Sequence, residues 1–191
     1  TDDCLSPYDN ITARMLWGRM PIERATALTY YHPGAYSSLL MYKLKYGNEP
    51  HIGVWFGEYM ANSLMPYGVF DGIDMIIPLP IHKRRERERG YNQSQEIARG
   101  IGDISSIKVQ NNIVERSRYT VSQTKLTHTD RTKNVKGAFT LLRPDAIRGK
   151  HVLLVDDIIT TGATIAACAN ELAKAEDVKI SIMTVGRTHY I

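Results

Sequence analysis

Hydrophobic and polar positions follow two periods along the chain, and these periods predict strands and helices in alternation. Short runs rich in apolar, β-branched or aromatic residues predict strands, and they cover residues 25–31, 74–80, 152–155 and 178–185. Apolar positions three and four residues apart predict helices over residues 36–46, 52–65, about 92–104 and 163–175. Residues 1–24 show no clear period and are expected to form an irregular arm.

Each predicted helix has one apolar face, which should pack against the sheet. The first helix would use positions 36, 39, 40 and 44. The inner side of the second is predicted to hold Trp55, Phe56, Tyr59, Met60 and Leu64. Asn92 or Ser94 is expected to cap the third helix, whose apolar stripe comprises Ile97, Ala98, Ile101 and Ile104. The fourth would turn Ile165, Cys168, Leu172 and Ala175 toward the sheet.

The run VLLV at residues 152–155 is apolar without interruption, which is typical of a central parallel strand buried on both faces. Because strands and helices alternate along the chain, the sequence predicts an α/β fold with a parallel sheet. Such sheets bind ligands at the carboxyl ends of their strands. We find no internal repeat, low-complexity tract or Gly/Ser linker, so residues 1–191 are expected to form a single domain.

The composition fits a globular protein and argues against several other classes. The 191 residues are 43% hydrophobic and 23% charged, unlike disordered chains, collagen or coiled coils. The uncharged stretches are too short or too polar to span a bilayer, and the N-terminal residues do not resemble a signal peptide. The two cysteines, Cys4 and Cys168, are too few for a disulfide framework or a zinc ligand set. We therefore expect a reduced, cytoplasmic protein without membrane insertion.

Positive charge is concentrated in one part of the chain. Residues 82–150 hold 16 of the 24 Lys and Arg residues but 7 of the 20 Asp and Glu residues. A basic segment of this kind attracts anions such as phosphate, pyrophosphate or nucleic acid. Charge alone does not choose among these three.

The stretch VLLVDDIITTGAT at residues 152–164 carries the most specific chemistry. It places Asp156 and Asp157 at the carboxyl end of a strand, where two neighbouring carboxylates can accept hydrogen bonds from a vicinal diol such as that of ribose. The next residues open a helix, whose N–H groups, dipole and hydroxyls can bind a phosphate monoester: Thr160, Thr161, Gly162, Ala163 and Thr164. Gly162 lets the backbone approach that phosphate closely. The alternative is a core strand that ends in two solvent-facing carboxylates and a threonine cap.

A second segment, residues 77–93, combines a Pro-Leu-Pro strand end with a very basic loop that holds five cationic side chains within seven residues. Guanidinium groups suit pyrophosphate, a compact and multiply charged leaving group. Negative charge builds on that group during phosphoribosyl transfer, so fixed cations would stabilise the transition state. The alternative is a solvated helical face on which Glu86 and Glu88 neutralise the arginines, and it suits Arg87 best.

Residues 116–139 form a long, polar and basic segment with few apolar anchors. One interpretation is a flexible loop that closes over the reacting centre and excludes water, which competes for an oxocarbenium-like ribose. The other is an exposed linker or a nucleic-acid-binding arm. Composition does not distinguish the two.

Together these segments resemble a known family. Residues 152–164 are similar, position for position, to the signature of type I phosphoribosyltransferases, which bind 5-phosphoribosyl 1-diphosphate (PRPP). The wider resemblance is to the ComF family, phosphoribosyltransferase-like proteins associated with DNA uptake in competent bacteria. It rests on LKY at 44–46, PLP at 78–80, RRERERGYNQ at 84–93 and the pattern from Gln123 to Phe139. The last pattern also resembles amidophosphoribosyltransferases, whose glutamine-hydrolysing domain is not in this sequence.

The resemblance implies the type I phosphoribosyltransferase fold, a parallel sheet of about five strands flanked by helices. Residues 71–188 would form its core, and residues 25–70 a hood over the site. It also implies a Mg²⁺–PRPP complex, with the cation held mainly by ligand oxygens and waters and with Asp156 and Asp157 nearby. ComF proteins usually begin with a zinc ribbon of four cysteines, and Cys4 stands where the last would fall. Residues 1–24 are therefore expected to be its remnant, and zinc is expected only with an upstream ribbon.

The resemblance also implies which residues act on PRPP. Asp156, Asp157, Arg84 and Arg85 are the expected catalytic residues, working through positioning and electrostatics. The expected substrate-binding set adds the loop at residues 160–164 and a group of polar and basic side chains: Lys45, Lys83, Arg89, Tyr91, Asn92, Gln123 and Arg131. For Lys45 the alternative is a surface lysine on a helix.

Two functions remain open. The first is an enzyme that transfers the 5-phosphoribosyl group from PRPP to an unidentified nitrogen acceptor and releases pyrophosphate. The second is a catalytically silent PRPP sensor or a competence protein that handles single-stranded DNA, with Tyr91 and Tyr119 as stacking platforms. The expected partners are PRPP and pyrophosphate, and then single-stranded DNA or proteins of the competence machinery.

Overall fold

The computed structural model describes residues 1–118 and 137–188. Its centre is a sheet with the strand order β1-β6-β5-β2. These strands are β1 (Arg24–Tyr31), β2 (Met75–Pro78), β5 (His151–Ile159) and β6 (Lys179–Thr188). Every neighbouring pair is parallel, which confirms the predicted α/β fold. The apolar strands β5 and β6 occupy the middle, as expected for strands covered on both faces.

The main sheet has four strands within the described ranges, one fewer than expected. Val109 adds a single parallel bridge to Ile76 at the β2 edge, which is too short to count as a fifth strand. At the opposite edge, β1 pairs with β6 along its length. Residues 25–31, which the sequence assigned to a hood, therefore belong to the central sheet.

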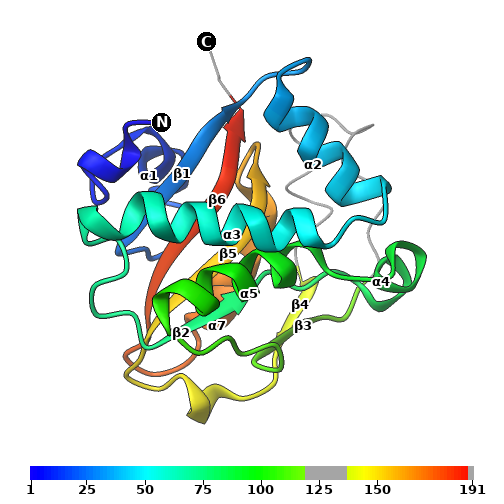
Figure 1. Ribbon diagram of the computed structural model, residues 1–191. Coiled ribbons are helices and arrows are strands. Elements are labelled where there is room, and N and C mark those ends of the chain that lie inside the picture. The colour runs from blue at the N-terminus through cyan, green and yellow to red at the C-terminus, as the bar shows by residue number, and fades with distance from the viewer. Residues whose placement is uncertain (119–136, 189–191) are drawn as a thin grey trace.

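Helices cover both faces of this sheet (Figure 1). On one face lie α3 (His51–Leu64) and α5 (Gln93–Ser105), and on the other α1 (Ile11–Leu16) and α7 (Ala163–Leu172). Side chains of β5 alternate between the two layers: Val152 and Leu154 pack with α1 and α7, and Leu153 and Val155 with α3 and α5. This alternation explains why the run is apolar at every position. None of the helices in the described ranges is long and apolar enough to cross a membrane.

Some aromatic residues lie outside the faces on which the periodicity placed them. In α2 (Tyr36–Tyr46), Tyr36 and Leu39 are exposed, and the buried positions are Ser38, Met41 and Leu44. In α3, Trp55 and Tyr59 are 48% and 50% exposed and stack on each other, so their predicted burial is wrong. Phe56, Met60 and Leu64 are buried as predicted. The apolar pattern is wider than the face that the sheet and α5 can cover.

Two further helices form where the pattern predicted none. In the arm expected to be irregular, Asn10 Oδ1 accepts a hydrogen bond from Ala13 N at 2.8 Å and caps α1. Ala13 and Leu16 are fully buried, which fixes this short helix on the core. The basic segment predicted as a loop is α4 (Lys83–Arg89), which buries no residue and therefore shows no apolar stripe.

A small antiparallel sheet stands beside the main one, formed by β3 (Val114–Arg116) and β4 (Phe139–Leu141). Val114 and Phe139 join the core cluster that contains α7. Three short 3-10 helices complete the described chain: η1 (Asp3–Leu5), η2 (Met65–Tyr67) and η4 (Pro144–Ala146). Most of the flexible loop predicted at residues 116–139 lies outside the described residues.

Candidate active site

Strand β5 carries two adjacent carboxylates at the carboxyl edge of the sheet. Its pairing with β2 ends at Val155, so Asp156 is the first residue beyond that partner. On the other side, pairing with β6 continues through Asp156 as far as Ile159. The carboxylates thus lie within β5 and not after its end, which corrects the prediction from the apolar run. They still face the edge where ligands bind parallel sheets.

Asp156 is held by two donors. Ser94 Oγ at the start of α5 donates to Asp156 Oδ1 at 2.9 Å, and the backbone N–H of Asp157 donates to the same oxygen at 2.8 Å. Burial, followed by repulsion from Asp157, raises the pKa of Asp156 to about 7. This carboxyl can therefore change charge near neutral pH.

Asp157 is paired with a cation from a distant helix. Lys45, in the last turn of α2, places Nζ 2.9 Å from Asp157 Oδ2, and the two side chains are 24% and 13% exposed. Burial disfavours the lysine charge, but attraction to Asp157 and Asp156 outweighs it, and the pKa of Lys45 lies above its ordinary value. Lys45 thus faces the two carboxylates and does not extend into solvent as a surface lysine would.

The phosphate loop, residues 160–164, connects β5 to α7. Gly162 has φ +73°, in the left-handed region that favours glycine, and α7 begins at the next residue. Thr161 Oγ1 accepts a hydrogen bond from Ala163 N at 3.4 Å. A cavity of about 50 Å³ opens here, lined by Asp156 and by residues 158–165. The loop and the first carboxylate therefore share one small hollow, as the sequence predicted.

A larger cavity lies between α2 and α4. Its volume is about 570 Å³, and its lining residues are Lys45, Tyr46, Asn48, Arg85, Glu88, Arg89 and Gly90. Three of the predicted cations, Lys45, Arg85 and Arg89, meet in this cation cavity. Arg89 donates from Nη1 to Gln93 Oε1 at 2.7 Å and lies over the Tyr46 ring at 5.4 Å from its centroid. Several of these groups can reach a compact polyanion at once.

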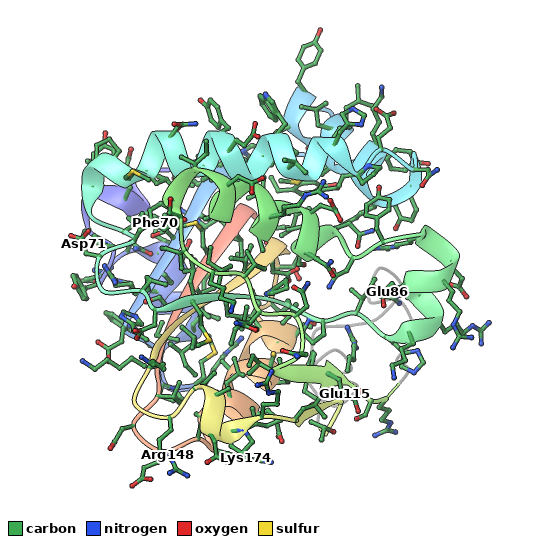
Figure 2. The ribbon with its side chains drawn as sticks, turned by 60° about the horizontal axis from the view of Figure 1, so that its bottom comes forward. Phe70, Asp71, Glu86, Glu115, Arg148 and Lys174 are labelled. Atoms are coloured by element: carbon green, nitrogen blue, oxygen red, sulfur yellow. The ribbon has the colours of Figure 1, made fainter. Side chains whose placement is uncertain are left out.

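Two other predicted cations do not line this cavity. Arg84 Nε lies 3.0 Å from Glu88 Oε1 on the exposed side of α4. Lys83 Nζ lies 3.9 Å from Glu115 Oε2 on β3. Figure 2 labels Glu86 on α4 and Glu115 on the small sheet below it. Glu88, not predicted to line a site, belongs to the cation cavity as its acidic member.

Tyr91 and Asn92 make internal hydrogen bonds at the junction of α4 and α5. Tyr91 Oη donates to the Leu44 carbonyl at 2.6 Å, and Asn92 Nδ2 donates to the Leu79 carbonyl at 3.1 Å. Asn92 Oδ1 also accepts from Ser94 N at 3.1 Å and caps α5, as predicted. These bonds fix the positions of α2 and α5 around the site. The Tyr91 hydroxyl is thus tied to α2.

Ser94 contacts Asp156 although the sequence did not mark it as functional, and Arg116 was expected only as the first residue of the segment 116–139. Ser94 follows the cap of α5, and its position opposite Asp156 depends on the packing of α5 on β5. Arg116 on β3 lies over the Phe139 ring at 5.4 Å. Burial and then repulsion from Arg85 lower the pKa of Arg116, against attraction from Asp156. The feature of the sequence that came nearest to indicating Arg116 was the excess of basic residues after position 82.

The remaining expectations concern residues outside the described ranges and the bound cation. Gln123, Arg131 and Tyr119 fall within residues 119–136, which the structure does not describe. In the described part of the chain, no three His, Cys, Asp or Glu side chains cluster closely enough to hold a metal ion. Asp156 and Asp157 supply the hard oxygen donors that suit Mg²⁺ bound chiefly through a ligand.

Comparison with known proteins gives matches over most of the chain. The phosphoribosyl transferase domain matches residues 86–188. The DNA utilization protein YhgH of Escherichia coli O157:H7 is 28% identical over 199 residues, covering 98% of this chain and 86% of that protein.

Two competence proteins match shorter stretches. Competence protein F of Haemophilus influenzae is 38% identical over 102 residues, which is 53% of this chain and 43% of that protein. Competence protein ComFC of Bacillus subtilis is 31% identical over 110 residues, 54% of this chain and 41% of that protein. Among solved structures, glutamine PRPP amidotransferase from B. subtilis matches with a TM-score of 0.48 and 18% identity, over 75% of this chain and 30% of the enzyme.

Proposed function

This chain belongs to the phosphoribosyl transferase domain family and is a ComF-family protein, and from that premise we propose that it binds Mg²⁺–PRPP and transfers the 5-phosphoribosyl group to a nitrogen acceptor. The observation that carries the proposal is the position of the two carboxylates. Asp156 lines the hollow of the phosphate loop, and Asp157 contacts Lys45, which lines the cation cavity. A diol site thus lies between two anion sites, in the order that the groups follow in PRPP.

Each part of PRPP has a complementary group in this arrangement. The 5-phosphate would accept hydrogen bonds from the N–H groups and hydroxyls of the phosphate loop at the start of α7. The ribose hydroxyls would donate to Asp156 and Asp157. The diphosphate would lie toward Lys45, Arg85 and Arg89, whose charges oppose its own.

The transfer breaks the bond between ribose C1 and the diphosphate oxygen and forms a bond from C1 to the acceptor nitrogen, and pyrophosphate leaves with the electron pair. Positive charge develops on the ribose next to Asp157 and the ionised form of Asp156, and negative charge develops on the leaving group next to Lys45, Arg85 and Arg89. Fixed opposite charges stabilise both. When bound with PRPP, Mg²⁺ would neutralise further charge on the diphosphate. The acceptor loses its proton to solvent.

Ligand binding requires a change at Asp157. In the described structure Lys45 Nζ is 2.9 Å from this carboxylate. A ribose hydroxyl would take the place of one hydrogen bond that Asp157 now accepts. The Lys45 ammonium has three donors, so it can contact the diphosphate while the ribose hydroxyl binds Asp157. Lys45 would thus link the diol site to the leaving group.

Pyrophosphate release tests this proposal. We expect release from Mg²⁺–PRPP only when the correct member of a panel of nucleobases and other nitrogen acceptors is present. Asp157→Asn should lower the rate at subsaturating PRPP about tenfold or more, since a charged hydrogen-bond partner contributes about 1.5–3 kcal/mol. Asp145→Asn is the matched control, because Asp145 is exposed and pairs with Arg148. If PRPP binds but no acceptor leads to pyrophosphate release, the protein is a PRPP sensor and the proposed transferase activity is wrong.

A second candidate is the handling of single-stranded DNA, and one observation favours it. Tyr42 and Tyr46 lie 5.0 Å apart on the exposed side of α2, beside Arg89 and the cation cavity. Exposed aromatic rings next to cations bind single strands by stacking and charge. This candidate requires oligonucleotide affinity that falls steeply with salt, is weakened by Tyr46→Ala and is unchanged in Asp157→Asn.

A further inference from the structure

The N-terminal segment packs directly against the phosphate loop. Arg19, shortly after α1, donates from Nη1 to the backbone carbonyl of Thr161. Its own carbonyl accepts a hydrogen bond from Asn170 Nδ2 on α7 at 2.8 Å. Both ends of Arg19 are thus attached to the loop and its helix. Leu16 is fully buried beneath the same loop, and a Cβ at Gly162 would lie 2.7 Å from its Cδ2.

The bond to Thr161 fixes the orientation of one peptide group. The peptide between Thr161 and Gly162 is trans, so its C=O and N–H point in opposite directions. Because the carbonyl points to Arg19, the N–H of Gly162 points away from it. Without that bond the peptide is easier to rotate, since rotation changes φ of Gly162 and glycine accepts either sign of φ.

The positive charge of Arg19 also favours phosphate binding at the loop. Its Nη1 lies 3.9 Å from the position of a Cβ on Gly162, so a permanent positive charge stands next to the loop. A guanidinium that binds a carbonyl also polarises the peptide and strengthens its N–H as a donor. A phosphate dianion would benefit from both effects.

From these contacts we infer that Arg19 is a positioning residue for the 5-phosphate, holding the peptide between Thr161 and Gly162 so that the Gly162 N–H donates to that phosphate. The inference rests on the proposed function. It assigns to residues 1–24, expected to be an irregular arm, a part in ligand specificity. Arg19 does not line the hollow of the loop and acts through Thr161.

Calorimetry with three probes tests the inference: Mg²⁺–PRPP, ribose 5-phosphate and inorganic pyrophosphate. Arg19→Ala should weaken PRPP and ribose 5-phosphate about tenfold, the effect of losing one charge-assisted hydrogen bond, and leave pyrophosphate unchanged. Arg19→Lys should recover part of the affinity, because an ammonium keeps the charge and a donor. Arg14→Ala is the control, as Arg14 is an exposed arginine on α1 paired with Asp9.

The outcomes separate this inference from the proposed function. Arg19 is exposed outside its loop contact, so the variants should fold. Unchanged affinities in Arg19→Ala, or an equal loss for all three probes, would overturn the positioning role while leaving PRPP binding in place. A wild-type protein that binds neither PRPP nor ribose 5-phosphate would overturn the proposed function and this inference with it.

Discussion

At the scale of single residues, the site depends on two adjacent carboxylates with different surroundings. Asp156 accepts from Ser94 Oγ and from the N–H of Asp157, whereas Asp157 meets the ammonium of Lys45. The pKa of Asp156 is thus close to neutral pH, and the negative charge of Asp157 is compensated by Lys45. The sequence predicted both carboxylates and the loop, because they lie in one continuous motif. It did not predict Ser94 or Arg19, since each comes from a distant segment that only the folded chain brings to β5 or its loop.

The raised pKa of Asp156 makes stability depend on pH. Its folded value of about 7 lies above the ordinary 3.8, so between these values the folded state holds a proton that the unfolded state releases. Stability should therefore fall as pH rises through this window and level off above it. Asp156→Asn removes the titration. Between pH 5 and pH 8, its free energy of unfolding should rise relative to that of the wild type by about 3 kcal/mol, which is about two pKa units at 1.36 kcal/mol each.

Urea unfolding at the two pH values checks this expectation, with Asp145→Asn as an exposed control. The free energy of unfolding of Asp156→Asn, relative to that of the wild type, should be larger at pH 8 than at pH 5. Parallel stability profiles for the two proteins would show that Asp156 carries no such charge penalty.

At the scale of elements, the site is built by helices that meet β5 from separate directions. α5 brings Ser94 to Asp156, α2 brings Lys45 to Asp157, and α4 adds Arg85 and Arg89. The sequence predicted α2, α3, α5 and α7, because each has an apolar stripe. It missed α4, which buries nothing, and α1, which is too short to show a period. Strand β5 is longer than predicted because β6 continues to pair with it past the apolar run.

Close packing between α3 and α5 sets the position of Ser94. Gly57 and Gly100 lie where the two helices touch, and a Cβ on Gly100 would come 2.1 Å from the Val54 carbonyl oxygen. Gly100→Ala must push the helices apart and should lower the free energy of unfolding by about 3 kcal/mol. Thermal or urea unfolding measures this, and Asn62→Ala on the exposed side of α3 is the control. Equal stability of Gly100→Ala and the wild type would mean that the helices are not in this close contact.

At the scale of the whole molecule, the parallel sheet brings together groups that are far apart in the chain. Lys45 and Asp157 are separated by most of the sequence yet are 2.9 Å apart. The strand order places β5 between β6 and β2, and α2 reaches its carboxylates through Lys45. The basic segment after residue 82 contributes Arg85 and Arg89 to the carboxyl edge of the sheet.

Calorimetric titration of the full chain with Mg²⁺–PRPP, beside the variant Asp156→Ala combined with Asp157→Ala, decides whether this edge is a PRPP site. We expect saturable binding to the wild type and none to the double variant, whose fold is checked by circular dichroism. Absence of binding to the wild type at millimolar PRPP, or equal binding to both proteins, would contradict a PRPP site at Asp156 and Asp157.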